Sequence, residues 1–153
     1  MVATKDSHSL RANAHRVMTD FDPDATGATI VDLDRATGGE GLPIENFRRF
    51  IAGLFRSVGT GSVTSFAIVA DTDDDLATTP TVVVQHAIGS APNAVGDTIW
   101  LECDAEDIKE VLAGATHVGV RVNLVTATDE CVVYFERADP YYPVRGLTTD
   151  YIS

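Results

Sequence analysis

The spacing of hydrophobic positions along this chain changes near residue 60. Between Leu42 and Val58, large apolar side chains recur every three or four residues, which is the period of an amphipathic helix. After Ser62 they alternate with polar side chains, which is the period of a β-strand. The pattern therefore predicts a helix followed by a region of strands.

The segment 43–58 is predicted to be a helix with one apolar face. Pro43 suits the first turn, where a missing N–H has no consequence, and Gly59 is a typical stop. The opposite side carries Arg48, Arg49 and Arg56. This side either pairs with carboxylates of the same chain or binds the acidic surface of a partner, so the three arginines are candidate partner-binding residues. The apolar positions are Ile44, Phe47, Phe50, Ile51, Leu54, Phe55 and Val58.

Five later runs alternate with period two and are predicted to be strands. They span residues 63–70, 81–88, 98–103, 117–125 and 131–137. In the third run, Ile99, Leu101 and Cys103 share one face. Only the turn sequence TATDE separates the last two runs, which therefore predict a β-hairpin.

A second helix is predicted directly after the third strand. Asp104 is a typical N-cap, Asp107 occupies the capping-box position, and Gly114 is a stop. The buried stripe of this helix is expected to consist of Ile108, Val111 and Leu112.

The two ends of the chain differ from the middle. Residues 1–42 hold many turn signals, a short amphipathic helix pattern over 10–21 and one brief strand, TIVDLD. This arm either wraps its own domain or docks on a neighbouring subunit. Pro140 and Pro143 are expected to hold residues 139–153 extended, and the tyrosine pair Tyr141 and Tyr142 between them is typical of an interface anchor. Such a tail can also fold back over its own core.

These elements predict a β-dominated α+β fold with a largely antiparallel sheet and two helices. The compact domain is expected at residues 43–138, between an extended N-terminal arm, 1–42, and an extended C-terminal tail, 139–153. One domain is the usual result for 153 residues, and a chain of this length buries enough surface to fold without a metal or a disulfide.

Charge narrows the range of partners. The formal net charge is −12, and Lys5 and Lys109 are the only lysines. Nucleic-acid backbones and anionic membrane surfaces both demand clustered basic residues, so neither is an expected partner. The apolar runs are too short to cross a bilayer, and the N-terminus has no signal-peptide pattern, which favours synthesis in a cytoplasm.

No motif in the sequence predicts catalysis, a cofactor or a metal. The acidic stretch 71–75 lacks the Gly and Glu of an EF-hand loop. A solvated turn is therefore favoured over a cation site in which residues outside this stretch supply further ligands. The four histidines show no ligand spacing, and the glycines at 59 and 61 follow a predicted helix, whereas a phosphate-binding loop precedes one. Cys103 and Cys131 are expected to be reduced thiols in the core, and a disulfide between them is the alternative. The chain is not expected to be an enzyme.

Three stretches resemble a known class of proteins: GDTIWLECDAEDI, HVGVRVNLVTATDECVVYFE and ADPYYPVRGLTTD. They are similar to the decoration or cement proteins of tailed-bacteriophage capsids. The resemblance implies a β-rich virion protein on the capsid surface, often a homo-oligomer (trimer or dimer), that binds across neighbouring subunits of the major capsid protein. The alternatives are a head–tail connector or tail-completion subunit and, from another class, a small enzyme or ligand-binding domain.

Overall fold

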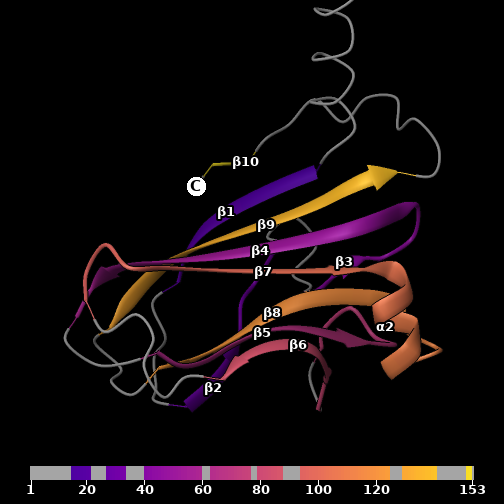
Figure 1. Cartoon of the computed structure of the whole chain (residues 1–153), viewed down its shortest axis with the longest axis horizontal. Coiled ribbons are helices and arrows are strands. Elements are labelled where there is room, and N and C mark those ends of the chain that lie inside the picture. Colours follow the sequence, from indigo (N-terminus) through magenta and orange to yellow (C-terminus); the bar gives the residue numbers. More distant parts are fainter. Residues whose placement is uncertain are drawn as a thin grey trace, which may run out of the picture.

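Two sheets lie face to face in the computed structural model of the chain, and one helix lies at an end of the sandwich (Figure 1). The structure describes residues 15–21, 27–33, 40–59, 63–76, 79–87, 94–124, 129–140 and 151–152. The elements are β1 (His15–Phe21), β2 (Gly27–Ile30), β3 (Leu42–Pro43), β4 (Phe47–Val58), β5 (Val63–Asp71), β6 (Thr81–Ala87), β7 (Thr98–Asp104), α2 (Ala105–Val111), β8 (His117–Leu124), β9 (Glu130–Pro140) and β10 (Tyr151–Ile152).

The strands divide into two sheets of different order. Sheet A runs β10-β1-β9-β4-β7, and sheet B runs β2-β8-β5-β6 with the short β3 also paired to β8. All strand pairs are antiparallel except β1 with β10. The expectation of a β-dominated, largely antiparallel fold is therefore confirmed, but the strands form two sheets, and α2 is the only helix among the described residues.

The predicted helix 43–58 is wrong, because these residues form the central strand β4. Its neighbour β9 pairs with it along nearly its whole length, and β7 pairs with Arg49–Phe55 on its other side. Phe50, Ala52 and Leu54 are fully buried on the side that faces sheet B. The other side also carries large apolar residues, Ile51 and Phe55. Because β4 is apolar on both faces, apolar and polar residues do not alternate regularly along it. The spacing of its large apolar residues therefore resembles that of a helix.

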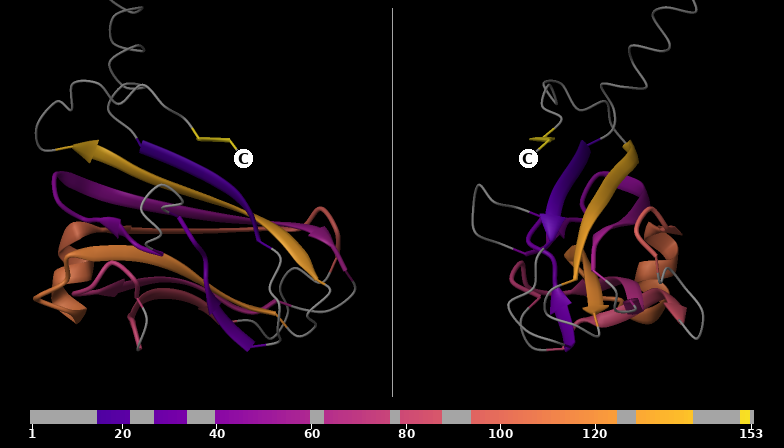
Figure 2. Two further views of the ribbon diagram at one scale, coloured as in Figure 1. Left: turned by 180° about the vertical axis from the view of Figure 1, so that it is seen from behind. Right: turned by 90° about the vertical axis from the view of Figure 1, so that its left-hand side faces the viewer.

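Much of the predicted N-terminal arm belongs to the sandwich. Residues 15–21, where a helix was expected, form β1, and β9 pairs with all seven of them. Both views of Figure 2 show β1 alongside β9. Val17, Val31, Leu33 and Leu42 are buried in the core. The boundary at residue 42 is therefore wrong, while residues 1–14 lie outside the described part of the chain.

The predicted hairpin between 117–125 and 131–137 is also wrong. Both runs are strands, but β8 lies in sheet B, where it pairs with β2, β3 and β5, and β9 lies in sheet A between β1 and β4. Each strand turns one apolar face towards the space between the sheets. Alternation identifies such strands but does not indicate to which sheet each belongs.

Helix α2 begins as the sequence predicts. The Asp104 carboxylate accepts hydrogen bonds from the backbone N–H groups of Glu106 and Asp107, each 2.9 Å long, and the Asp107 carboxylate accepts one from the Asp104 N–H. Ile108 is fully buried, but Val111, which was expected in the same stripe, is 46% exposed. The helix is only seven residues long, and it contacts β4, β6 and β7.

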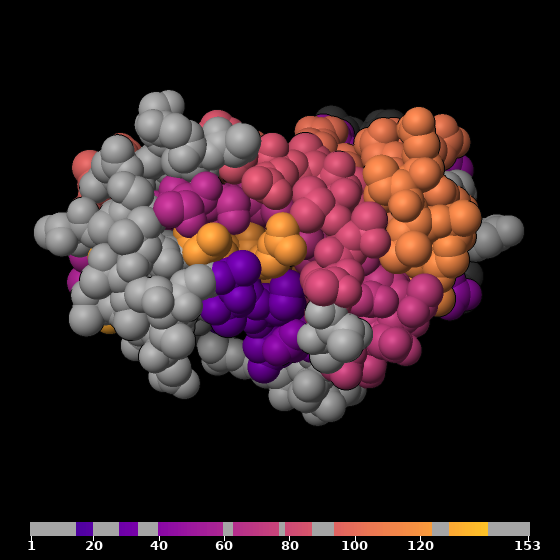
Figure 3. Space-filling model, turned by 90° about the horizontal axis from the view of Figure 1, so that it is seen from below, coloured from indigo at the N-terminus to yellow at the C-terminus, as the bar shows by residue number. Residues whose placement is uncertain are grey.

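The core fills the space between the sheets, and a smaller cluster covers part of the outer side of sheet B. Leu76 follows β5 and folds back, so that it packs with Ala67 and Val69. The three aspartates just before it, residues 73–75, are exposed and form a turn at the surface. Strands of sheet B and α2 form the face of the molecule seen in Figure 3.

Candidate functional site

The outer side of sheet A carries a row of large side chains on four neighbouring strands. The strand register places Gly53 of β4 between Trp100 of β7 and Tyr134 of β9, and it places Met18 of β1 beside Tyr134. Phe55 lies two residues further along β4, on the same side of the sheet. We call the surface formed by Phe55, Trp100 and Tyr134 over Gly53 the aromatic face.

The Trp100 ring lies flat on the backbone of Gly53. A Cβ atom built on Gly53 would lie 2.6 Å from Cζ3 of the indole and 2.9 Å from both neighbouring atoms, Cε3 and Cη2. Because the three distances are nearly equal, the Cβ position lies above the plane of the ring. A position within the plane would lie much farther from Cε3 and Cη2 than from Cζ3. In a sheet, this direction is roughly perpendicular to the sheet. One face of the indole therefore covers the glycine, and the other points away from the protein.

Two further aromatic rings stand against the indole. Phe55 lies 5.4 Å from Trp100 between ring centroids, with a right angle between the planes. Tyr134 lies 5.7 Å away at an angle of 64°. Both are edge-to-face arrangements, which aromatic pairs favour. Trp100 nevertheless remains 53% exposed, so its neighbours hold the ring in place without covering it.

A row of charged residues borders the aromatic face. Ile51 lies between Glu102 and Glu136 in the strand register. Arg49 pairs with Glu102 at 2.6 Å, and Arg16 pairs with Glu136 at 3.2 Å. The hydrogen bond from Arg49 lowers the pKa of Glu102 below its ordinary value. The hydroxyl of Tyr134 donates to Glu136, and burial together with this carboxylate raises the pKa of Tyr134 to about 12. At neutral pH the row thus consists of two ion pairs without net charge.

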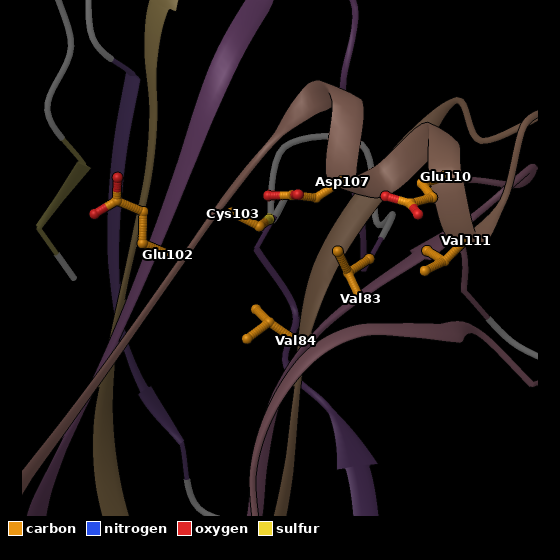
Figure 4. A pocket seen from close by; sticks show the side chains of 7 residues that line it. All are labelled: Val83, Val84, Glu102, Cys103, Asp107, Glu110 and Val111. Carbon is orange, nitrogen blue, oxygen red and sulfur yellow. The ribbon is translucent and has the colours of Figure 1, made fainter.

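A pocket of about 300 Å³ lies between α2, β6 and β7 (Figure 4). Its sides combine apolar groups with carboxylates, but Glu102 points away from the other side chains that line it. Asp107 is already engaged in the helix cap. The lining residues are Val83, Val84, Glu102, Cys103, Asp107, Glu110 and Val111.

The two thiols are free and buried, as the sequence predicts. Burial raises the pKa of Cys103 to about 12, with a further contribution from Asp107 and other nearby carboxylates. Burial also raises the pKa of Cys131 to about 12, against an opposing effect of Arg56. Since the thiolate is the reactive form, neither cysteine is activated as a nucleophile.

The three candidate arginines do not share a surface. Arg48 and Arg49 are exposed, and Arg49 borders the aromatic face. Arg56 points into the sandwich, where its guanidinium lies 3.6 Å from the carboxylate of Asp129, and neither side chain is exposed. In this arrangement Arg56 is inaccessible to a partner, so its predicted place beside Arg48 and Arg49 is wrong. Tyr141 and Tyr142 lie outside the described residues.

Sequence reasoning missed the aromatic face, although one observation pointed to it. If Ile99, Leu101 and Cys103 face the core, alternation places Trp100 on the opposite, polar side with Thr98 and Glu102. A tryptophan at a solvent-facing position is unusual enough to merit attention. Its neighbours from β4 and β9 are distant in sequence, so no local pattern connects them to it.

Within the described ranges, no group of three or more histidine, cysteine, aspartate or glutamate side chains is arranged to hold a metal ion. Among the same residues, no helix has the length and hydrophobicity needed to cross a membrane.

Comparisons with known proteins give no family for the chain. No family model and no curated protein sequence matches it. The K1 cleaved adhesin domain of Lys-gingipain from Porphyromonas gingivalis W83 is 14% identical over 65% of this chain, with a TM-score of 0.40, and the match spans 60% of that domain. The coat protein of tobacco streak virus is 15% identical, with a TM-score of 0.35, over 89% of this chain and 96% of that protein. Likenesses this slight carry no argument about function.

Proposed function

We propose that the protein is a structural component of a virion that decorates a bacteriophage capsid by binding across neighbouring major capsid subunits. The observation that carries this proposal is the edge of sheet A, where a short terminal strand adds to β1. Residues Tyr151 and Ile152 pair in parallel with Val17 and Met18.

This edge has the properties of a docking site for extended segments. On its inner side β1 is paired with β9 at all seven positions, and on its outer side, within the described part of the chain, β10 pairs with Val17 and Met18. An exposed strand edge is a ready template for a further strand, and many proteins bind extended partners by this β-strand addition. We infer that neighbouring subunits of an assembled shell exchange strands: the edge of β1 receives an extended segment of a neighbour, and β10 leaves that edge to add to the neighbour in turn.

The sequence resemblance supports the choice of partner. Its first stretch corresponds to the edge strand β7 and the start of α2, and its second corresponds to the internal strands β8 and β9. The third contains Tyr141 and Tyr142, the expected interface anchors in the predicted tail. The partners in this role are the major capsid protein and further copies of this chain, in a trimer or dimer, and the exposed Arg48 is an additional contact candidate.

The test measures binding to assembled shells. Full-length protein should co-sediment with shells of its cognate major capsid protein, and a chain that ends at Pro140, without β10, should bind at least ten-fold more weakly. The exposed-residue variant Val111→Ala serves as a control and should bind like the full-length protein, because Val111 lies on α2. Thermal melting checks that the shortened chain is folded. Absence of binding by the full-length protein, or full binding by the shortened chain, would contradict the proposal.

A further inference from the structure

We propose that the aromatic face is a binding site for a neutral saccharide, with a pyranose ring stacked on Trp100. This inference concerns a surface other than the edge of β1 and stands independently of the proposed capsid role. It rests on the fixed, flat orientation of one exposed indole and on the balanced charges beside it.

The exposed indole has the shape that a sugar ring requires. The inner face of the indole lies on Gly53, and the outer face is open, with 53% of Trp100 exposed. A pyranose has an apolar face of C–H groups, which carry slight positive charge, and these groups match the negative face of an aromatic ring. A flat exposed indole therefore offers the correct contact for one sugar ring.

The neighbours of Trp100 hold its ring rigidly. Phe55 and Tyr134 both contact Trp100 edge-to-face, and any Cβ at position 53 would collide with the indole. Glycine thus creates the space in which the ring lies, and two neighbours hold it there. A ring that is already oriented loses little conformational freedom when a ligand binds, which favours affinity.

The charged row beside the aromatic face offers polar partners to a sugar. The adjacent row presents two carboxylates and two guanidinium groups, joined as the pairs Arg49–Glu102 and Arg16–Glu136. Carboxylates accept hydrogen bonds and guanidiniums donate them, so hydroxyl groups, which do both, find partners of either kind. Hydrogen bonds to charged groups are also the stronger ones.

Charge and size both favour a small, neutral ligand. The chain carries a net charge of −12, which disfavours phosphorylated ligands, while the two neutral ion pairs give a cation no excess of negative charge to bind. Arg49 and Glu102 are about half exposed, with side-chain values of 46% and 54%. A single sugar ring leaves such a pair hydrated, whereas a protein partner covering the face would have to desolvate it. A small neutral ligand therefore fits best.

The test uses the fact that Trp100 is the only tryptophan of the chain. Cellohexaose, maltohexaose and mannohexaose are titrated into the full-length protein while tryptophan fluorescence is recorded, and binding is measured independently by calorimetry. We expect at least one of the three to give a saturable change in both. A fluorescence change that follows protein concentration instead of sugar concentration would identify a second copy as the occupant and overturn the proposal, as would the absence of saturation with all three sugars.

Three variants locate the site. By calorimetry, Trp100→Ala should lose binding, and Gly53→Ala should weaken it at least ten-fold, because the added methyl group displaces the indole while the tryptophan is retained. Val111→Ala removes an equally exposed apolar side chain from α2 and should bind normally. Melting curves establish that each variant is folded. Unchanged sugar affinity in both Trp100→Ala and Gly53→Ala would overturn the site. Trp100→Ala is also tested for binding to capsid shells, and because this measurement does not depend on the sugar, the two proposals can fail separately.

Discussion

Arg56 lies on the core side of β4, and its position there follows from alternation along the strand. Phe50, Ala52, Leu54 and Arg56 occupy successive inward positions, and all four are buried. A guanidinium in a core is stable only with a charged or polar partner, and Asp129 supplies one at 3.6 Å. The helical interpretation placed Arg56 outside because helical spacing sets it opposite the apolar positions, whereas the spacing of a strand sets it on the same side as Leu54.

Gly59 makes room for the partner of Arg56. Its φ is +106°, a conformation that other residues rarely adopt. A Cβ at this position would lie 1.8 Å from the Asp129 carboxylate. The glycine that the sequence presents as a helix stop therefore has a different role, which is to let the chain pass directly over a buried carboxylate.

Asp129→Asn should strongly destabilise the protein. The substitution keeps the shape of the side chain but leaves the buried Arg56 without its opposite charge, and removal of one partner of a buried pair typically costs about 3–5 kcal/mol. Urea denaturation measures the free energy of unfolding. The control is the double variant Arg56→Met, Asp129→Leu, which removes both charges and should recover most of the stability. A loss below about 1 kcal/mol in the single variant would contradict the importance of the pair.

At the scale of elements, Leu76 fixes the turn after β5 against sheet B. Leu76 is 1% exposed, and its Cδ1 would lie 2.3 Å from a Cβ built on Gly119 of β8. The backbone N–H of Gly41 also donates to the carbonyl of Asp74 in the same turn, at 2.8 Å. One apolar side chain at the end of an acidic turn thus attaches the turn to the strands beneath it.

Leu76→Ala should therefore lower the free energy of unfolding by about 2–5 kcal/mol, as buried leucine truncations do. Denaturant unfolding is again the measurement. Val95→Ala provides the comparison, since Val95 is 61% exposed and its truncation should change stability by less than about 0.5 kcal/mol. Equal effects of the two substitutions would show that the second cluster does not stabilise the fold.

Sequence patterns predicted those elements whose ends are marked by local signals. β5 to β9 and the capped start of α2 were found because turn residues or a capping box mark their limits. β4 was missed because it is central and apolar on both faces, and β1 because its seven residues gain stability from β9, more than a hundred positions away. Pairing between distant strands leaves no trace in local periodicity, so neither the two-sheet arrangement nor the aromatic face could be derived.

At the scale of the whole molecule, the strands near the start of the chain close both sheets. β1 covers the side of β9 that β4 leaves open, and β2 pairs with β8 at the edge of sheet B. Val17, Val31 and Leu33 point into the common core from these segments. Sequence composition placed residues 1–42 outside the domain because their apolar residues are sparse, but Val17, Val31, Leu33 and Leu42 are buried.

A chain that begins at Gly39 is therefore expected to fail to fold, in contrast to what composition predicts. Burial of one valine or leucine side chain stabilises a protein by about 1.5–3 kcal/mol, so the loss of Val17, Val31 and Leu33 removes roughly 5–9 kcal/mol. This is comparable to the whole stability of a typical domain, about 5–15 kcal/mol. Circular dichroism during heating should show no cooperative transition, and light scattering should show aggregation.

The matched control begins at Ala14 and keeps both strands. It should melt cooperatively and close to the full-length protein, because every pairing residue of β1 is retained. If the chain from Gly39 also melted cooperatively at that temperature, β1 and β2 would be dispensable and the original boundary at residue 42 would hold. If the chain from Ala14 collapsed as well, residues before β1 would contribute to the core. The two chains together thus determine where the domain begins and which residues remain available as a docking arm.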